Sequence, residues 1–176
     1  IPTTDAAMTS EKKIADEATF IALGHQLLVA LGEDPTDPRV IDTPRRWAKM
    51  WREFIGYAPG TIDTAFAHPE GDDQAIIVRG MRVWSMCEHH LLPFWCDIAI
   101  GYIPKDKVLG LSKFGRIAHD ASHRLQLQER LVRQIANAVH RVTGSPDVAV
   151  LAEGEHLCMT MRGIKTPARM ISSVLD

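Results

Sequence analysis

Three potential metal ligands place the strongest constraint on how this chain folds. Cys87 and His90 stand three positions apart in the run Cys87-Glu88-His89-His90, and Cys158 follows 71 positions after Cys87. A catalytic zinc ion is typically held by three nitrogen or sulfur ligands and keeps its fourth position for water. If one zinc binds all three side chains, the fold must bring two distant segments together and leave the metal open for hydrolysis.

The alternative for any cysteine is burial as a small apolar side chain. We favour that interpretation for Cys96, which lies among the apolar residues of a predicted strand. Cys87 differs because the Glu88, His89 and His90 that follow it are polar and costly to bury without partners. The sequence therefore favours metal binding at Cys87.

Two further histidines accompany the ligands. His156 precedes Cys158 by two positions, which on a strand predicts side chains on the same face and in the same pocket. His89 is next to a proposed ligand. Because imidazole titrates near neutral pH, either ring is a candidate general acid or base. The alternative is that one of them only orients a neighbour.

Composition narrows the class of protein. The chain has 176 residues, 24% of them charged, and a net charge of -2, which argues against a nucleic-acid binder. No apolar run approaches the roughly 18 residues of a membrane span, and no charged-then-apolar signal segment opens the chain. Three cysteines are too few for a disulfide framework. We expect a cytoplasmic protein with reduced thiols.

Hydrophobic periodicity predicts an α+β fold with segregated, mostly antiparallel strands. In residues 94–103 the alternation puts Phe94, Cys96, Ile98, Ile100 and Tyr102 on one face. Helices are predicted over residues 11–31, from 42–44 onward, over 113–123 and over 126–142. Strands are predicted over residues 76–78, 81–84, 94–103, 148–151, 157–162 and 170–175.

Basic residues near helix starts are candidate anion contacts. Ser112, Lys113 and Arg116 open one predicted helix, and a helix N-terminus attracts anions. Arg46 lies in the first turn of another helix, where the helix dipole disfavours a cation. Arg162 stands at the end of the strand predicted over residues 157–162. For the residues at the two helix starts, solvation is the alternative that residue spacing alone favours.

Taken together, these segments resemble the GTP cyclohydrolase I family, a group of zinc enzymes that open pterin and tetrahydrofolate biosynthesis. No single segment is specific, but their combination and order are. The matching segments are Gly32-Glu33-Asp34-Pro35, Asp42-Thr43-Pro44-Arg45-Arg46, Ser85-Met86-Cys87-Glu88-His89-His90, Gly101-Tyr102-Ile103-Pro104, Gly110-Leu111-Ser112-Lys113, Arg116-Ile117, residues 126–130, and residues 155–158 through Arg162-Gly163.

The resemblance implies conversion of GTP and water to 7,8-dihydroneopterin triphosphate and formate, and a role for each matching side chain. Cys87, His90 and Cys158 are similar to the family's zinc ligands. His89, His156 and Ser112 resemble its catalytic residues. The implied substrate contacts are Glu129 and Gln128 at the guanine, and Lys113, Arg116, Arg162 and Arg46 at the triphosphate.

The resemblance also implies the tunnelling fold, in which an antiparallel sheet with helices on one face joins an oligomeric barrel. A homodecamer with active sites between subunits is the expected assembly, with no nucleic-acid or membrane partner. We expect an N-terminal helical segment over residues 1–73 and a catalytic domain over residues 74–176.

Two other functions are consistent with the same residues. A related tunnelling-fold hydrolase acting on another purine nucleotide would keep the zinc and guanine motifs. A non-catalytic, zinc-stabilised oligomer would need a fourth protein ligand, because structural zinc sites are usually closed. His89 or His156 as that ligand would favour the non-catalytic interpretation.

Overall fold

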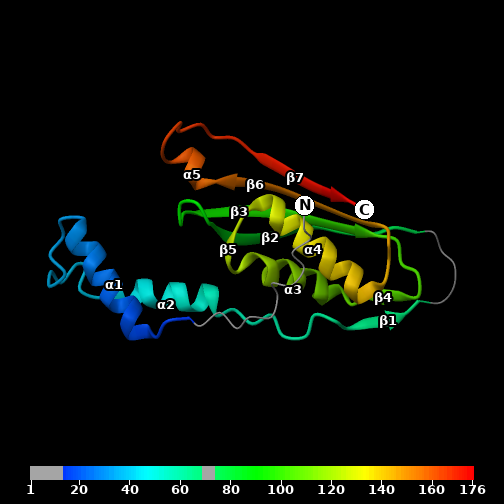
Figure 1. Cartoon of the computed structure of the whole chain (residues 1–176), viewed down its shortest axis with the longest axis horizontal. Coiled ribbons are helices and arrows are strands. Elements are labelled where there is room, and N and C mark those ends of the chain that lie inside the picture. Colours follow the sequence, from blue (N-terminus) through cyan, green and yellow to red (C-terminus); the bar gives the residue numbers. More distant parts are fainter. Residues whose placement is uncertain (1–13, 69–73) are drawn as a thin grey trace, which may run out of the picture. The chain divides into compact units, whose positions relative to one another are not determined.

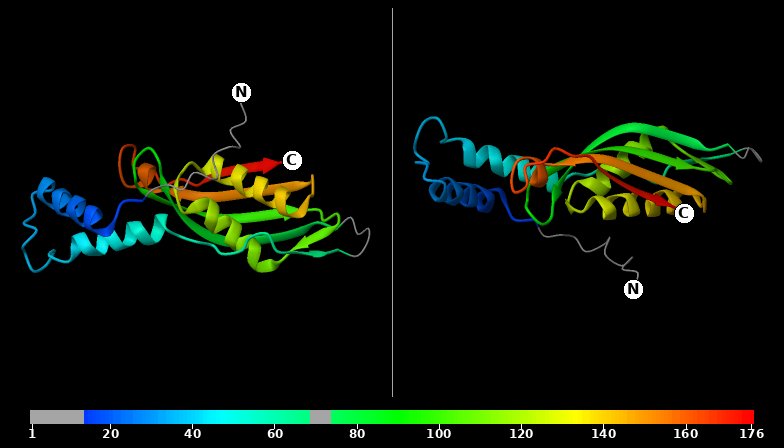
Figure 2. Two further views of the ribbon diagram at one scale, coloured as in Figure 1. Left: turned by 60° about the horizontal axis from the view of Figure 1, so that its bottom comes forward. Right: turned by 90° about the horizontal axis from the view of Figure 1, so that it is seen from above.

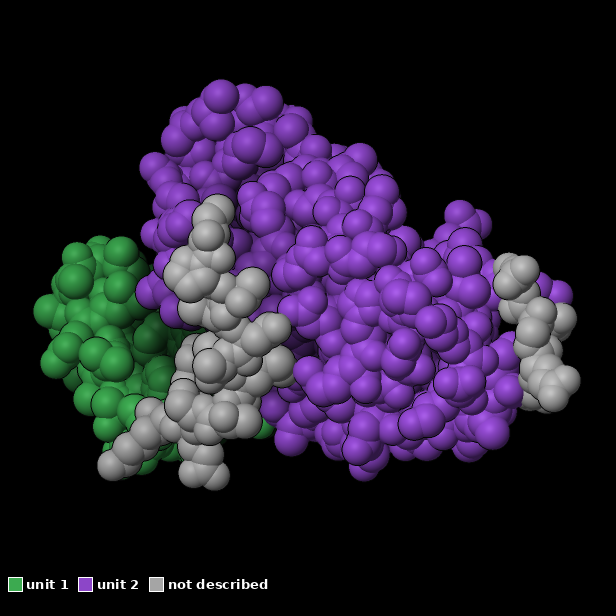
Figure 3. Space-filling view, turned by 45° about the vertical axis from the view of Figure 1, so that its right-hand side comes forward, with its two compact units in different colours: residues 1–56 green, residues 57–176 purple. Residues whose placement is uncertain are grey.

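The computed structural model describes residues 14–68 and 74–176. The chain divides into two units, Ile1–Gly56 and Tyr57–Asp176, which Figure 3 distinguishes by colour. This division falls earlier than the boundary expected at residue 73. The reason is strand β1 (Ala65–Ala67), which pairs with β4 (Lys107–Leu109) of the second unit.

The first unit contains helices α1 (Glu17–Ala30) and α2 (Thr43–Ile55). The Asp16 side chain caps α1 by accepting a hydrogen bond from the backbone N–H of Thr19 at 2.8 Å. Pro44 lies in the first turn of α2, where its missing N–H costs nothing. Both predicted helices are confirmed within the described residues; the predicted stretch 11–13 lies outside them.

The second unit is built on a five-stranded sheet with the order β5-β2-β3-β6-β7. The long strands are β2 (Ile76–Cys87), β3 (Pro93–Tyr102), β6 (Val148–His156) and β7 (Met170–Leu175), each antiparallel to its neighbours among them. The two-residue strand β5 (Leu125–Gln126) pairs with β2 in parallel. The sheet is therefore mostly antiparallel, as the sequence predicts.

Helices α3 (Leu111–Ser122) and α4 (Gln128–Thr143) cover one face of this sheet (Figures 1 and 2). Alternate residues of β3 face them, and all five that the sequence predicts on one face are buried. Phe114, Leu131 and Ile135 on the helices complete the apolar core. The mixed α+β architecture is thus confirmed, and no helix among the described residues is long and apolar enough to cross a membrane.

The strand predicted over residues 157–162 is wrong. Strand β6 runs through His156, and the chain then forms a single helical turn, α5 (Leu157–Thr160). The Thr160 hydroxyl donates to the carbonyl oxygen of His156 at 2.9 Å, which closes this turn. His156 and Cys158 are therefore not alternate residues of one strand, and the turn sets their relative positions.

Candidate metal centre

The three predicted ligands converge at one end of the sheet. Cys87 ends β2, His90 lies in the turn between β2 and β3, and Cys158 lies in α5. Their ligand atoms all lie within 4.8 Å of one another. Antiparallel pairing of β3 with both β2 and β6 brings these segments together, because it places the β2–β3 turn beside the end of β6.

The turn holding His90 is tightly bonded. The backbone N–H groups of His90 and Leu91 both donate to the carbonyl oxygen of Cys87, at 3.3 and 2.9 Å. Leu91 has a φ of 54°, in the left-handed region that a branched side chain rarely adopts. Such conformations cost roughly 1–3 kcal/mol and cluster at functional sites. The turn thus directs His90 back toward Cys87 at some cost in backbone energy.

Two of the three donor spacings are close to those around a tetrahedral zinc ion, and the third pair lies within 4.8 Å. The sulfurs of Cys87 and Cys158 are 4.0 Å apart, and the Cys87 sulfur is 3.5 Å from Nδ1 of His90. With metal–sulfur bonds of about 2.3 Å and metal–nitrogen bonds of about 2.0 Å, tetrahedral edges are roughly 3.8 and 3.5 Å. Burial, followed by the nearby Cys87 sulfur, raises the pKa of the Cys158 thiol. A cation between the sulfurs would offset that effect.

A polar network fixes the metal-binding turn to the start of α4. Arg130 forms an ion pair with Glu88, and its Nε donates to the Gln126 side-chain oxygen at 2.6 Å. The backbone N–H of Glu88 donates to the carbonyl oxygen of Gln126 at 3.2 Å. The sequence did not predict this network. The signal for it was Glu88, a charged residue between two candidate ligands, which needs a partner such as Arg130.

The ring of His156 is held from two sides. It stacks on Phe94, its pairing partner on β3, with the ring centroids 4.4 Å apart and the planes inclined by 4°. Its Nε2 is 2.9 Å from the side-chain oxygen of Gln128. Burial lowers the pKa of His156, and the Glu129 carboxylate opposes that shift only partly. The ring is therefore biased toward its neutral form. The sequence predicted Phe94 only as a core residue, and its contact with His156 was missed.

Gln128 and Glu129 begin α4 but have opposite surroundings. Gln128 is completely buried, whereas the Glu129 side chain is exposed. Glu129 lies close enough to His156 to affect its pKa. The exposed carboxylate is available to a ligand at this end of the sheet.

The predicted anion contacts on α3 lie apart from the metal ligands. The last residue of α3, Ser122, lies near the metal ligands. Its carbonyl oxygen accepts a 2.6 Å hydrogen bond from the hydroxyl of Ser85, which stands two residues before Cys87 in β2. Ser112 stands in the first turn, about 15 Å away along the helix axis. Beside it, Lys113 and Arg116 donate to the carbonyl oxygen of Thr61 at 2.8 and 3.3 Å.

The remaining predicted residues are exposed. His89 is adjacent to His90, with the two rings edge-to-face at a centroid separation of 6.1 Å. Arg162 lies just beyond α5, and its charge acts to lower the pKa of Cys158. Arg46 belongs to the first unit and pairs with Asp42 at 3.3 Å. Within the second unit, the structure thus brings together the three ligands, His156, Gln128 and Glu129, and separates them from the basic start of α3.

Cys96, the cysteine assigned to the core, is completely buried. Burial raises the pKa of its thiol to about 12. A thiol in such surroundings stays protonated and inert at neutral pH. The interpretation of Cys96 as a core residue is confirmed.

Comparison with known proteins identifies the family. The family model described as GTP cyclohydrolase I matches residues 22–175. A GTP cyclohydrolase 1 from Hyperthermus butylicus is 45% identical over 154 residues, covering 87% of this chain and 78% of that protein. One from Streptococcus mutans is 46% identical over 162 residues, covering 90% of this chain and 84% of that protein. This chain belongs to the GTP cyclohydrolase I family.

Proposed function

We propose that this chain converts GTP and water to 7,8-dihydroneopterin triphosphate and formate at a zinc centre held by Cys87, His90 and Cys158. The observation that carries the proposal is the convergence of these three side chains, whose ligand atoms all lie within 4.8 Å of one another. Among the described residues no fourth histidine, cysteine or carboxylate joins that group. An open coordination position favours a catalytic over a structural metal.

Bound zinc would supply a Lewis acid that lowers the pKa of a water molecule for attack on C8 of the guanine ring. The protein's own residues would then handle the protons. His89 is exposed beside the metal ligand His90 and would donate a proton to the guanine imidazole ring. His156 would serve as a second acid–base group in ring opening and formate release.

Glu129 would select the guanine. Its side chain is exposed at the first turn of α4 and lies near His156. A carboxylate accepts hydrogen bonds from adjacent N–H groups, which guanine offers on its Watson–Crick edge and adenine does not present in the same pattern.

The triphosphate requires several fixed cations. Lys113 and Arg116 form a pair of cations at the start of α3, with Ser112 beside them. Arg162, just beyond α5, is a third cation. Because the α3 group is remote from the metal ligands of the same chain, a complete site needs a neighbouring copy. We therefore propose that subunits assemble through the tunnelling fold into an oligomeric barrel, a decamer in the family's pattern, and that Arg46 contributes to the phosphate region.

The test is formate release from a panel of purine nucleotides by the zinc-loaded protein. We expect formate from GTP together with a product that becomes a fluorescent pterin after oxidation. ATP and ITP serve as comparisons, since both lack the guanine N–H pattern. Intact zinc with turnover of another nucleotide but none of GTP would support the related tunnelling-fold hydrolase. Intact zinc without turnover of any nucleotide would support a structural metal.

A further inference from the structure

The amide nitrogen of Gln128 has no hydrogen left for a substrate. The side chain is completely buried, and its amide nitrogen donates to the carbonyl oxygens of Ala152 and Met170, at 3.0 and 2.9 Å. An amide nitrogen carries two hydrogens, and both are used. The amide therefore binds strands β6 and β7 from beneath the sheet, and only its oxygen points to the metal end.

These two carbonyl oxygens fix which way the amide lies. The reverse orientation would put the amide oxygen against two other oxygens and would lose both hydrogen bonds. The oxygen of Gln128 must therefore accept, and the group it accepts from is Nε2 of His156 at 2.9 Å. An acceptor at that distance requires a hydrogen on Nε2. In the neutral ring, Nδ1 then has no hydrogen and keeps its lone pair.

The backbone leaves room for this contact only because residue 154 is glycine. A Cβ at Gly154 would lie 2.2 Å from the carbonyl oxygen of Trp95, 2.6 Å from the Cys96 sulfur and 3.1 Å from the Gln128 side-chain oxygen. Any side chain there would push Gln128 away from His156. On the other side, Phe94 stacks on the ring and limits its rotation. Gly154, Phe94 and Gln128 together hold one ring orientation.

We propose that Gln128 is a positioning residue that fixes His156 as the Nε2–H tautomer and leaves Nδ1 as its proton acceptor, rather than a contact to the guanine. This inference rests on the proposed function for the part that His156 plays in turnover. The tautomer itself rests only on hydrogen bonds within the chain. Nδ1 of His156 makes no hydrogen bond with the residues that the structure describes, so it is available to the reacting molecule.

The kinetic test replaces Gln128 by methionine, which has similar length but neither accepts from His156 nor donates to the strands. We expect kcat for formate release to fall about 10- to 100-fold, the range for losing a group that orients a functional imidazole. The KM for GTP and the zinc content are expected to stay unchanged. An increase in KM at unchanged kcat would make Gln128 a substrate contact and overturn the proposal.

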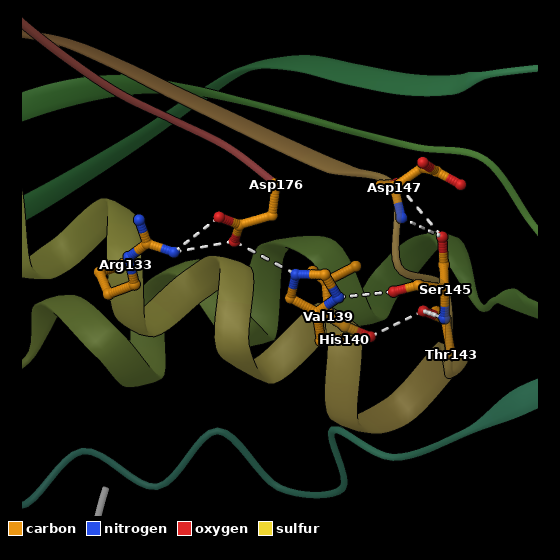
Figure 4. Close-up of polar contacts among 7 residues, drawn as sticks. All are labelled: Arg133, Val139, His140, Thr143, Ser145, Asp147 and Asp176. Atoms are coloured by element: carbon orange, nitrogen blue, oxygen red, sulfur yellow. Dashed lines mark hydrogen bonds and ion pairs between the residues drawn. The ribbon is translucent and has the colours of Figure 1, made fainter. Parts of the chain in front are cut away.

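A matched control separates positioning from general loss of stability. Ser145 lies just beyond the far end of α4 (Figure 4) and is also completely buried. Its hydroxyl donates to the carbonyl oxygen of Ile103 at 2.6 Å. Ser145→Ala therefore removes buried hydrogen bonds without touching His156, and urea unfolding gives the stability of both variants. Equal losses of kcat in the two variants would overturn the proposal.

A spectroscopic test reads the tautomer without any turnover. The intact oligomer is labelled with ring-¹⁵N histidine and measured by solid-state NMR at about pH 8, above the ordinary imidazole pKa near 6.5. The His156 signals are assigned by their loss in His156→Gln. We expect a protonated Nε2 and a bare Nδ1 in the parent protein and in Ser145→Ala, and a mixture in Gln128→Met. A proton on Nδ1 in the parent would overturn the proposal, whatever nucleotide the enzyme accepts.

Discussion

Two histidines are tied to opposite ends of helix α4, and their hydrogen bonds differ in one respect. At the C-terminal end, both ring nitrogens of His140 meet acceptors, since Nδ1 contacts the Ser145 carbonyl oxygen and Nε2 lies 3.2 Å from the Asp176 carboxylate (Figure 4). At the N-terminal end, His156 uses only Nε2, on Gln128. Both rings are partly buried and well oriented. Only His156 retains a nitrogen for chemistry.

The two histidines differ in hydrogen bonding rather than in burial, and we propose that this difference separates a structural from a functional histidine. Arg133 holds Asp176 through two bonds of 2.9 and 2.8 Å, so the C-terminal cluster is satisfied by its own members. This cluster of Arg133, His140 and Asp176 connects α4 to the end of β7. At the N-terminal end, Nδ1 of His156 has no hydrogen-bond partner among the described residues. Substitutions at the two ends are therefore expected to affect different quantities.

Loss of the metal is the largest expected effect. Cys158→Ala removes one of three ligands, so we expect bound zinc to fall well below one per chain and formate release to disappear. His140→Gln at the other end is expected to keep both zinc and activity. Elemental analysis and formate release are measured on the same samples. Full zinc occupancy in Cys158→Ala would remove Cys158 from the metal centre.

Replacement of His156 or His140 by alanine is expected to have the second-largest effect. His156→Ala is expected to lower kcat by about 100- to 10,000-fold, the usual range for a general acid or base, while zinc stays bound. His140→Ala is expected to cost about 1 kcal/mol in the free energy of unfolding for its lost hydrogen bonds, with kcat unchanged. Steady-state kinetics and urea unfolding separate the two results. A large loss of kcat in His140→Ala would contradict the distinction between the two ends.

Alanine substitution of one glycine near each end gives a smaller contrast. Gly154→Ala forces atoms apart in a packed core, which typically costs about 1–3 kcal/mol, and moves Gln128, so kcat is expected to fall as well. Gly144 ends α4 with a φ of 71° and has open space around it. Gly144→Ala is therefore expected to cost about 1–2 kcal/mol through backbone strain alone. Lower kcat in Gly144→Ala would show that the ends are not independent.

The smallest effect concerns pH. Hydrogen bonding to Arg133 is the main cause that lowers the pKa of Asp176 in the folded chain, with His140 also contributing. A carboxyl group with a lowered folded pKa stabilises the protein above its unfolded pKa of about 3.9 and loses that contribution as the pH falls through the folded value. Asp176→Asn is expected to flatten the stability curve below about pH 4, by less than about 1 kcal/mol. An identical acid limb in parent and variant would show that the pair contributes nothing.

Much of the second unit could be predicted from the sequence, because its strands carry strong local patterns. The alternation in residues 94–103 identified the buried face of β3. Polar residues around Cys87 distinguished it from Cys96. These signals are local, since they depend on side chains that neighbour each other along the chain.

Other features could not be predicted because tertiary contacts decide them. The residues of α5 have strand-like composition, but the chain turns there to bring Cys158 toward Cys87. In the sequence, Gln128 likewise looks like an ordinary polar residue at the start of a helix. Its burial depends on Gly154, a residue on another element 26 positions away. In the proposed function, the contacts on α3 serve the site of a neighbouring copy, and no local sequence pattern reveals such an arrangement.

A zinc titration tests most directly whether the three-ligand centre carries the reaction. Metal-depleted protein receives zinc in steps, and formate release from GTP is measured at each step. The rate is expected to rise in proportion to added zinc and to level off near one zinc per chain. Full formate release from metal-free protein, or complete zinc binding without formate release, would contradict the account.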